Sequence, residues 1–177
     1  GVVYTPPIHG GVMPKGLKST SSLITIGFSV SESAPNTFTQ GRVDLQLNPL
    51  DNEVFVVQAI NLDPSSPDVV VGLNTFTNAS LTTTSLTTTG NLSQSGTLAV
   101  TQQRIQAGVV PFSQVSMETP PTGLEYIGII STNDFFVQVE GFNNLLTKGV
   151  SGKVYGYRAK AESSVYAALV QSEVLSA

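Results

Sequence analysis

Alternation of apolar and polar residues restricts much of this chain to β-structure. Every second residue is apolar in residues 23–30, and residues 41–47 repeat the pattern. Residues 53–62 are apolar at consecutive positions, which is typical of a central strand covered on both faces. Because successive side chains of a strand point to opposite faces, we expect the first two segments to be half-buried strands and the third to be fully buried.

Turn-forming residues divide the rest of the chain into further short strands. We expect strands at 68–76 and 150–161, and a β-hairpin that joins 123–131 to 135–142 through a short polar turn. Residues 164–175 fit a helix or a strand equally well. Roughly eight to ten short strands between Gly, Pro and Asn turns predict an all-β, two-sheet sandwich of the single jelly-roll type.

A threonine repeat is the most unusual segment. Residues 80–90 read SLTTTSLTTTG, a five-residue unit written twice. Threonine is β-branched and favours extended chain, but an odd period turns Leu81 and Leu86 to opposite faces. We therefore expect residues 79–106 to form a long inserted hairpin with a polar flank that contacts other subunits. The predicted contact residues there are Thr82, Thr83, Thr84, Thr87, Thr88 and Thr89.

The length and composition predict one domain with an extended arm at each end. The 177 residues fit a single core, with arms at 1–20 and 163–177. We expect Pro6, Pro7 and Tyr166 in these arms to contact neighbouring subunits. The eight Lys and Arg residues are scattered and the net charge is -4, which excludes direct nucleic-acid binding, and no apolar run is long enough for membrane insertion.

Few residues offer chemistry. The chain has no cysteine, and its one histidine, His9, lies in a Gly/Pro-rich arm without a partner for a catalytic triad. Asp63 and Asp68 flank one loop and form a weak candidate site for Ca²⁺, although aspartates of this kind more commonly shape turns. We therefore predict no catalytic residues, no cofactor and no enzymatic activity.

In the arrangement of its segments, without a shared signature motif, the chain resembles the virion coat and decoration proteins of phage-like viruses. The resemblance lies in the leading arm GVVYTPPIHGGVMPKG, the strands LITIGFSV, EVFVVQAINL and LEYIGIISTNDFFVQVEGF, and the threonine-rich hairpin. It implies a structural subunit of the virion, a capsid or capsid-decorating protein. Its partners would be identical subunits and other virion proteins, in a homo-oligomer of three or more copies. Lys15 and Lys18 alone fall short of the basic arm of coat proteins that package a genome directly.

A second class of protein shares the same pattern. Secreted adhesins, pilins and carbohydrate-binding modules are also all-β, polar at the surface and without catalytic residues. Such a protein would lie outside the cell or at its surface. An exposed aromatic platform would favour this alternative, whereas a particle built of many copies would favour the virion.

Overall fold

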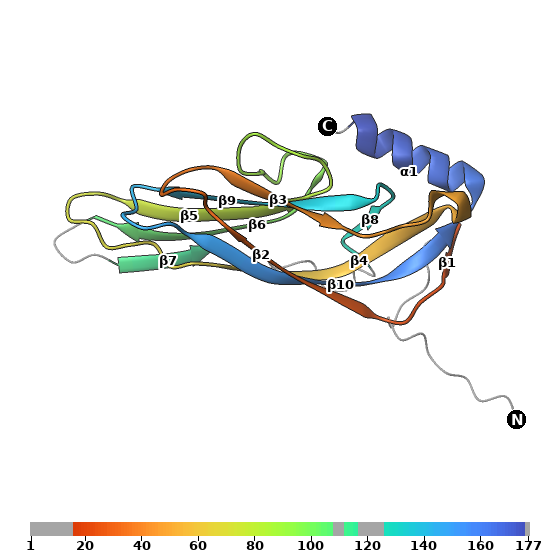
Figure 1. Ribbon diagram of the computed structural model, residues 1–177, viewed down its shortest axis with the longest axis horizontal. Coiled ribbons are helices and arrows are strands. Elements are labelled where there is room, and N and C mark those ends of the chain that lie inside the picture. The colour runs from red at the N-terminus through yellow and green to blue at the C-terminus, as the bar shows by residue number, and fades with distance from the viewer. Residues whose placement is uncertain (1–15, 108–111, 117–125, 176–177) are drawn as a thin grey trace, which may run out of the picture.

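The computed structural model describes residues 16–107, 112–116 and 126–175, which form an elongated sandwich of two antiparallel sheets (Figure 1). Sheet A contains β1 (Leu17–Ser19), β2 (Ile24–Ser31), β4 (Glu53–Pro64), β8 (Gly128–Ile130) and β10 (Gly149–Ala161). Sheet B contains β3 (Thr39–Asp44), β5 (Thr75–Thr82), β6 (Thr97–Gln106), β7 (Phe112–Ser116) and β9 (Asp134–Phe142). A 3-10 turn, η1 (Pro49–Asp51), precedes β4, and a helix, α1 (Ser163–Leu175), follows β10.

The order of the strands is that of a single jelly roll. In sheet A, β10 lies between β4 and an edge shared by β1 and β2, and β8 flanks β4 on the far side. In sheet B the order is β3, β9, β5, β6, β7. The chain changes sheet at six of the nine connections between the described strands, so that late strands insert between early ones, as a jelly roll requires. The predicted fold is therefore confirmed.

The main core lies between the sheets and follows the predicted alternation. Leu45 and Leu47 are buried there, and Ile24, Ile26, Phe28 and Val30 of β2 pack against the same cluster. In β4, Phe55 and Val57 face this core, while Val54 and Val56 face the opposite side of sheet A. The prediction that residues 53–62 form a central strand covered on both faces is confirmed for its first half.

The second core lies under α1, which corrects the predicted C-terminal arm. Val165, Tyr166 and Leu169 of the helix pack against a buried cluster on the outer face of sheet A. That cluster consists of Leu17, Val54, Val56, Tyr157, Ala159 and Ala161. These three residues lie at i, i+1 and i+4, on neighbouring positions of the helix surface, so they meet this patch of sheet A together.

Two predicted strand assignments are wrong. Residues 68–74 form a connection, and the strand begins at Thr75. The predicted hairpin of 123–131 and 135–142 is also incorrect, because β8 pairs with β4 in sheet A whereas β9 pairs with β3 and β5 in sheet B. A tight polar turn looks the same in sequence whether its two strands pair with each other or pass to opposite sheets.

The threonine-rich segment contributes the β5–β6 hairpin. β5 pairs with β6 from Thr75↔Ile105 to Thr82↔Thr97, in agreement with the predicted hairpin. β5 also pairs with β9 and lies at the centre of sheet B, so the first leg of the hairpin belongs to the body of the sandwich. Residues 83–96 connect the two strands.

Candidate functional site: an apolar loop apex on a buried polar network

Three connections meet at one end of the sandwich, on the left in Figure 1. They are residues 32–38 between β2 and β3, residues 65–74 between β4 and β5, and residues 143–148 between β9 and β10. Side-chain hydrogen bonds join the first and second of these connections to the third. We call this end the loop apex.

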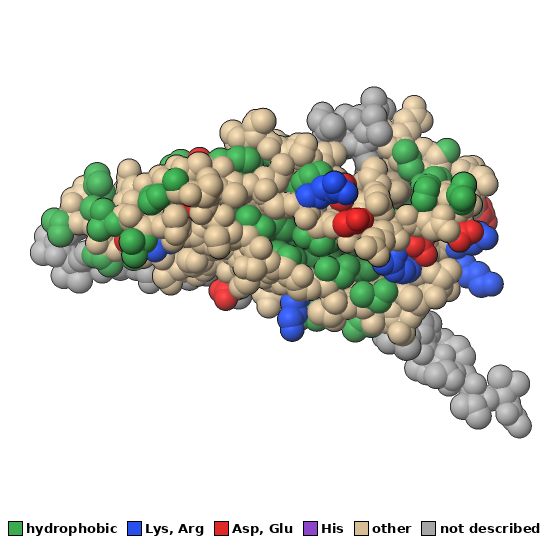
Figure 2. All heavy atoms as spheres, viewed as in Figure 1, with side chains coloured by type: hydrophobic (Ala, Val, Ile, Leu, Met, Phe, Trp, Pro, Cys, Tyr) green, Lys and Arg blue, Asp and Glu red, His purple; other side chains and the backbone are tan. Residues whose placement is uncertain are grey.

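Large apolar side chains are exposed at the loop apex. Val71 is 96% exposed, and the space-filling view shows hydrophobic side chains gathered at this end of the molecule (Figure 2). The exposed members are Val69, Val71 and Leu73 from one connection and Leu145 and Leu146 from another. Because exposed apolar residues are common singly but not in groups, this cluster is the candidate contact surface of the described residues.

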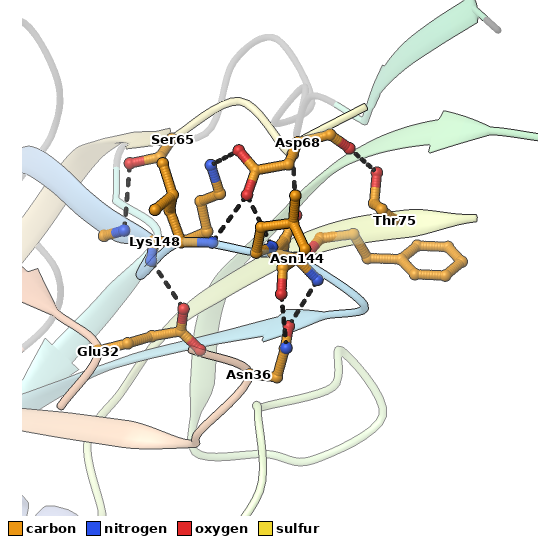
Figure 3. A network of polar contacts seen from close by, with 11 residues as sticks. Glu32, Asn36, Ser65, Asp68, Thr75, Asn144 and Lys148 are labelled. Atoms are coloured by element: carbon orange, nitrogen blue, oxygen red, sulfur yellow. Dashed lines mark hydrogen bonds and ion pairs between the residues drawn. The ribbon is translucent and has the colours of Figure 1, made fainter. Parts of the chain in front are cut away.

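Asp68 joins the β4–β5 connection to the β9–β10 connection through hydrogen bonds of its carboxylate. Its Oδ1 accepts a 2.6 Å ion-paired hydrogen bond from Lys148 Nζ, and its Oδ2 accepts the backbone N–H groups of Leu145 and Leu146 (Figure 3). The hydrogen bond from Lys148, with help from the two N–H groups, lowers the pKa of Asp68 below its ordinary value. One carboxylate thus fixes both exposed leucines through their own backbone.

Glu32 joins the β2–β3 connection to the β9–β10 connection through backbone hydrogen bonds. Its carboxylate is buried and accepts backbone N–H groups from Thr37, Gly141 and Lys148 at 2.8, 2.9 and 2.7 Å. These donors come from the β2–β3 connection, from β9 and from the residue that precedes β10. A buried carboxylate is tolerated here because backbone donors surround it.

Asn36 and Asn144 complete the network (Figure 3). Asn144 N–H donates to Asn36 Oδ1, and Asn36 Nδ2 donates back to the Asn144 carbonyl, at 2.8 and 2.9 Å. The Asn144 side chain donates to the Phe76 carbonyl and accepts the Asp68 N–H. Asn36 adopts φ 58°, a left-handed conformation that Asn accepts more readily than most residues. The three loops are thus cross-linked before any partner arrives.

The threonine residues do not form the predicted contact surface as a group. Thr82 and Thr83 are buried within their own chain, which corrects the prediction that they contact other subunits. Thr84 and Thr89 are half-buried, whereas Thr87 and Thr88 are exposed. The reason is that residues 84–90 fold back over the outer face of sheet B, which sequence periodicity does not reveal.

Beneath this fold-back lies a network of neutral side chains. Gln138, fully buried in β9, donates to Thr82 Oγ1 at 2.7 Å and to Gln40 Oε1 at 2.9 Å. Ser80 Oγ donates to Gln138 Oε1 at 2.6 Å and accepts the Gly90 N–H. The Leu86 N–H donates to Gln40 Oε1, so the fold-back is anchored to sheet B at Leu86 as well as at Gly90.

The remaining predicted site residues have other roles or lie outside the described part of the chain. Tyr166 is half-buried in α1 and packs against the outer face of sheet A in its own chain, which corrects its assignment to an extended arm. Pro6 and Pro7 lie outside the described residues.

The oxygens of Asp68, predicted as a weak Ca²⁺ ligand, are bound by groups of the protein itself. Both oxygens accept hydrogen bonds from N–H donors, so the carboxylate binds the Lys148 ammonium group and the backbone of the two leucines and not a metal ion. Asp63 lies in β4 opposite Ser151. Among the described residues, no group of three His, Cys, Asp or Glu side chains is placed to hold a metal ion.

The sequence analysis missed the residues that build the loop apex. Glu32, Asn144 and Lys148 each lie next to a strand end, and nothing in their local sequence distinguishes them from other polar residues. Their partners are distant in the chain: Asp68 and Lys148 are 80 residues apart.

In the described part of the chain, no helix is both long and apolar enough to cross a bilayer. No protein-family model, curated protein or solved structure matches the chain.

Proposed function

We propose that the chain is a structural virion protein, a capsid or capsid-decorating subunit, that assembles with copies of itself and other virion proteins. The observation that carries this proposal is the loop apex: an exposed apolar cluster on a base whose charged groups are all paired internally.

The architecture of the loop apex favours association in two ways. Because Asp68 and Glu32 already hold the loops in place, a partner need not supply the free energy to order them. The carboxylates and the ammonium group are turned inward, so the exposed side chains that meet a partner are uncharged. Copies of the chain related by a rotation axis can therefore approach without repulsion between like charges.

The outward face of β2 also suits a subunit that packs against neighbours in a shell. The outward residues of β2 are Thr25, Gly27, Ser29 and Ser31, which are exposed, small and uncharged. A flat face of this kind accommodates close approach of a neighbouring protein. Jelly rolls serve in viral capsids and also in lectins, so the fold is compatible with the proposal but does not select it.

Light scattering and electron microscopy of the purified chain test the proposal. We expect closed particles, or oligomers that dock on a larger shell. Val71→Ser should weaken association at least tenfold, about 1.4 kcal/mol, because it removes an apolar group from the contact. The matched control is Leu50→Ser, which changes a side chain that is 92% exposed in η1, beside α1 at the opposite end of the sandwich. A chain that stays monomeric at all concentrations would contradict the proposal.

A further inference from the structure

The outer face of sheet B carries a second cluster of polar and aromatic side chains, beside the fold-back of residues 84–90. Strand register places these residues in two adjacent rows across β9, β5 and β6. The first row is Phe142, Phe76 and Arg104, and the second row is Glu140, Asn78 and Gln102. Residues that are paired in register point to the same face, so both rows face outward together.

A hollow of about 290 Å³ lies above the second row. Asn78 and Gln102 line its floor, Val100 adds an apolar wall, and Thr89 and Gly90 of the fold-back form the other side. The Gly90 N–H is fixed to Ser80 Oγ at 2.8 Å, so this side of the hollow is held in place. We call this space the sheet B hollow. Its volume suits a single small ring.

Its polar groups have unused hydrogen-bonding capacity. Gln102 Nε2 donates to Asn78 Oδ1 at 2.7 Å, which aligns the two amides. Among the described residues, Asn78 Nδ2 has no acceptor and Gln102 Oε1 has no donor, although both side chains are half-buried. The pair therefore presents one free donor and one free acceptor.

The first row supplies an aromatic surface beside the hollow. Phe76 and Phe142 meet edge to face with ring centroids 6.2 Å apart, and the Arg104 guanidinium lies 5.3 Å from the centre of the Phe76 ring. Phe142 is 40% exposed, so part of its ring is open to a ligand. Arg104 forms no ion pair with a carboxylate of the described residues, and its Nε is buried without a hydrogen-bond partner.

From this juxtaposition we infer that the sheet B hollow binds one ring of a neutral saccharide. Neighbouring sugar hydroxyls each donate and accept, and the aligned amides of Asn78 and Gln102 offer one group of each kind. Phe142 lies in the neighbouring row and does not line the hollow, so a substituent of the sugar that extends towards the first row would pack on its ring. The residues that line the hollow are not those of the loop apex, although the Phe76 carbonyl accepts a hydrogen bond from Asn144, and binding does not require assembly.

Two other ligand classes fit less well. An apolar ligand would bury the free amide groups without partners, at a cost of about 1–3 kcal/mol each. A phosphate or nucleotide would approach the Glu140 carboxyl, which lies opposite Asn78 in β9. A neutral ligand with several hydroxyls avoids both costs.

Nuclear magnetic resonance on the ¹⁵N-labelled chain tests the inference directly. The probes are glucose, galactose, mannose and N-acetylglucosamine, each titrated to roughly 20 mM to detect a Kd near 1 mM. We expect the side-chain NH₂ signals of Asn78 and Gln102 to shift and saturate with at least one sugar. If none of these sugars moves the two signals, or if inorganic phosphate moves them and the sugars do not, the inference is wrong.

Variants then assign the binding to the amides. Asn78→Ala and Gln102→Ala should each weaken sugar binding at least tenfold, about 1.4 kcal/mol. Asn61→Ala is the matched control, since this exposed amide lies in β4 of sheet A. Phe142→Leu provides a second route if an amide variant fails to fold, and it should also reduce affinity. Unchanged affinity in folded Asn78 and Gln102 variants would overturn the assignment, whether or not the chain assembles.

Discussion

The loop apex buries charged groups, Glu32 and Lys148, beside the amide of Asn144, whereas the buried polar groups beneath the threonine fold-back are all neutral. At the apex, Glu32 accepts three backbone N–H groups and Asp68 accepts two. On sheet B, Gln138 donates to two side chains and accepts from a third. Both regions bury polar atoms, but the carboxylates of the apex bind mainly backbone N–H groups, whereas Gln138 binds other side chains.

The difference follows from which backbone groups lack partners. Where three loops converge, several N–H groups point inward together, and a carboxylate is the side chain with acceptors alone. On the face of a sheet, the ladder already satisfies the backbone of the strands, so the side chains bond to one another and to the N–H groups of the fold-back that covers them. An amide, with both donors and acceptors, suits that position. The apex should therefore respond to pH, and the network of Gln138 should not.

Substitution of Glu32 should have the largest effect. Glu32→Gln replaces an acceptor by an NH₂ group that faces backbone donors, so at least one buried N–H loses its partner. We expect a loss of about 3–5 kcal/mol in the free energy of unfolding, measured by urea denaturation. Glu162→Gln, at an exposed carboxylate, is the control. A loss as small as that of the control would refute the role given to Glu32.

Removal of Lys148 should have the next largest effect. Lys148→Met keeps the length of the side chain but leaves the Asp68 carboxylate without its cation, for a loss of about 2–3 kcal/mol. A double-mutant cycle with Asp68→Asn measures the coupling between the two residues. Additive losses in that cycle would show that the ion pair contributes nothing of its own.

The neutral network should be less costly to break. Gln138→Leu leaves the hydroxyls of Ser80 and Thr82 to find new partners, and we expect a loss of about 2 kcal/mol. The pH dependence of unfolding should keep the shape seen in the unmodified chain, since no charge is removed. An altered pH profile would break the contrast between the two regions.

The smallest effect should come from titration of Glu140. Burial raises the pKa of Glu140, and the nearby charge of Glu32 adds to the increase. A carboxyl whose pKa is raised in the folded state binds its proton more tightly there, so stability should rise as pH falls through the raised pKa towards the ordinary value of 4.5. Asp68 acts in the opposite sense, because its lowered pKa stabilises the fold above its ordinary value of 3.8 and that stability is lost as pH falls further.

Melting temperatures between about pH 3 and pH 8 should therefore pass through a maximum in mildly acidic solution. Glu140→Gln should remove the rise and keep the fall at low pH. A monotonic decline from neutral pH in the unmodified chain would contradict the sign assigned to Glu140.

Sequence patterns predicted the strands, whose alternation depends on residues close together in the chain. They did not predict the burial of side chains that contact segments far away in the sequence. The alternation of Ile24, Ile26, Phe28 and Val30 defines a strand locally, and the structure confirms it. The burial of Thr82 depends on Gln138, 56 residues away, and no periodicity encodes that contact. The residues of the loop apex are equally scattered, because loop positions are fixed by the sandwich that carries them.

The place of β10 in sheet A has a consequence for synthesis. This strand is the last of the described strands in the sequence, yet it lies between β4 and the edge formed by β1 and β2. A growing chain cannot close sheet A until residues 149–161 have left the ribosome, and Lys148 reaches the loop apex at the same moment. Contacts of such high sequence separation form slowly, so we expect the folded subunit to appear after translation of β10. An unfinished chain would lack the ordered apex, and with it the surface through which we propose that the subunit assembles.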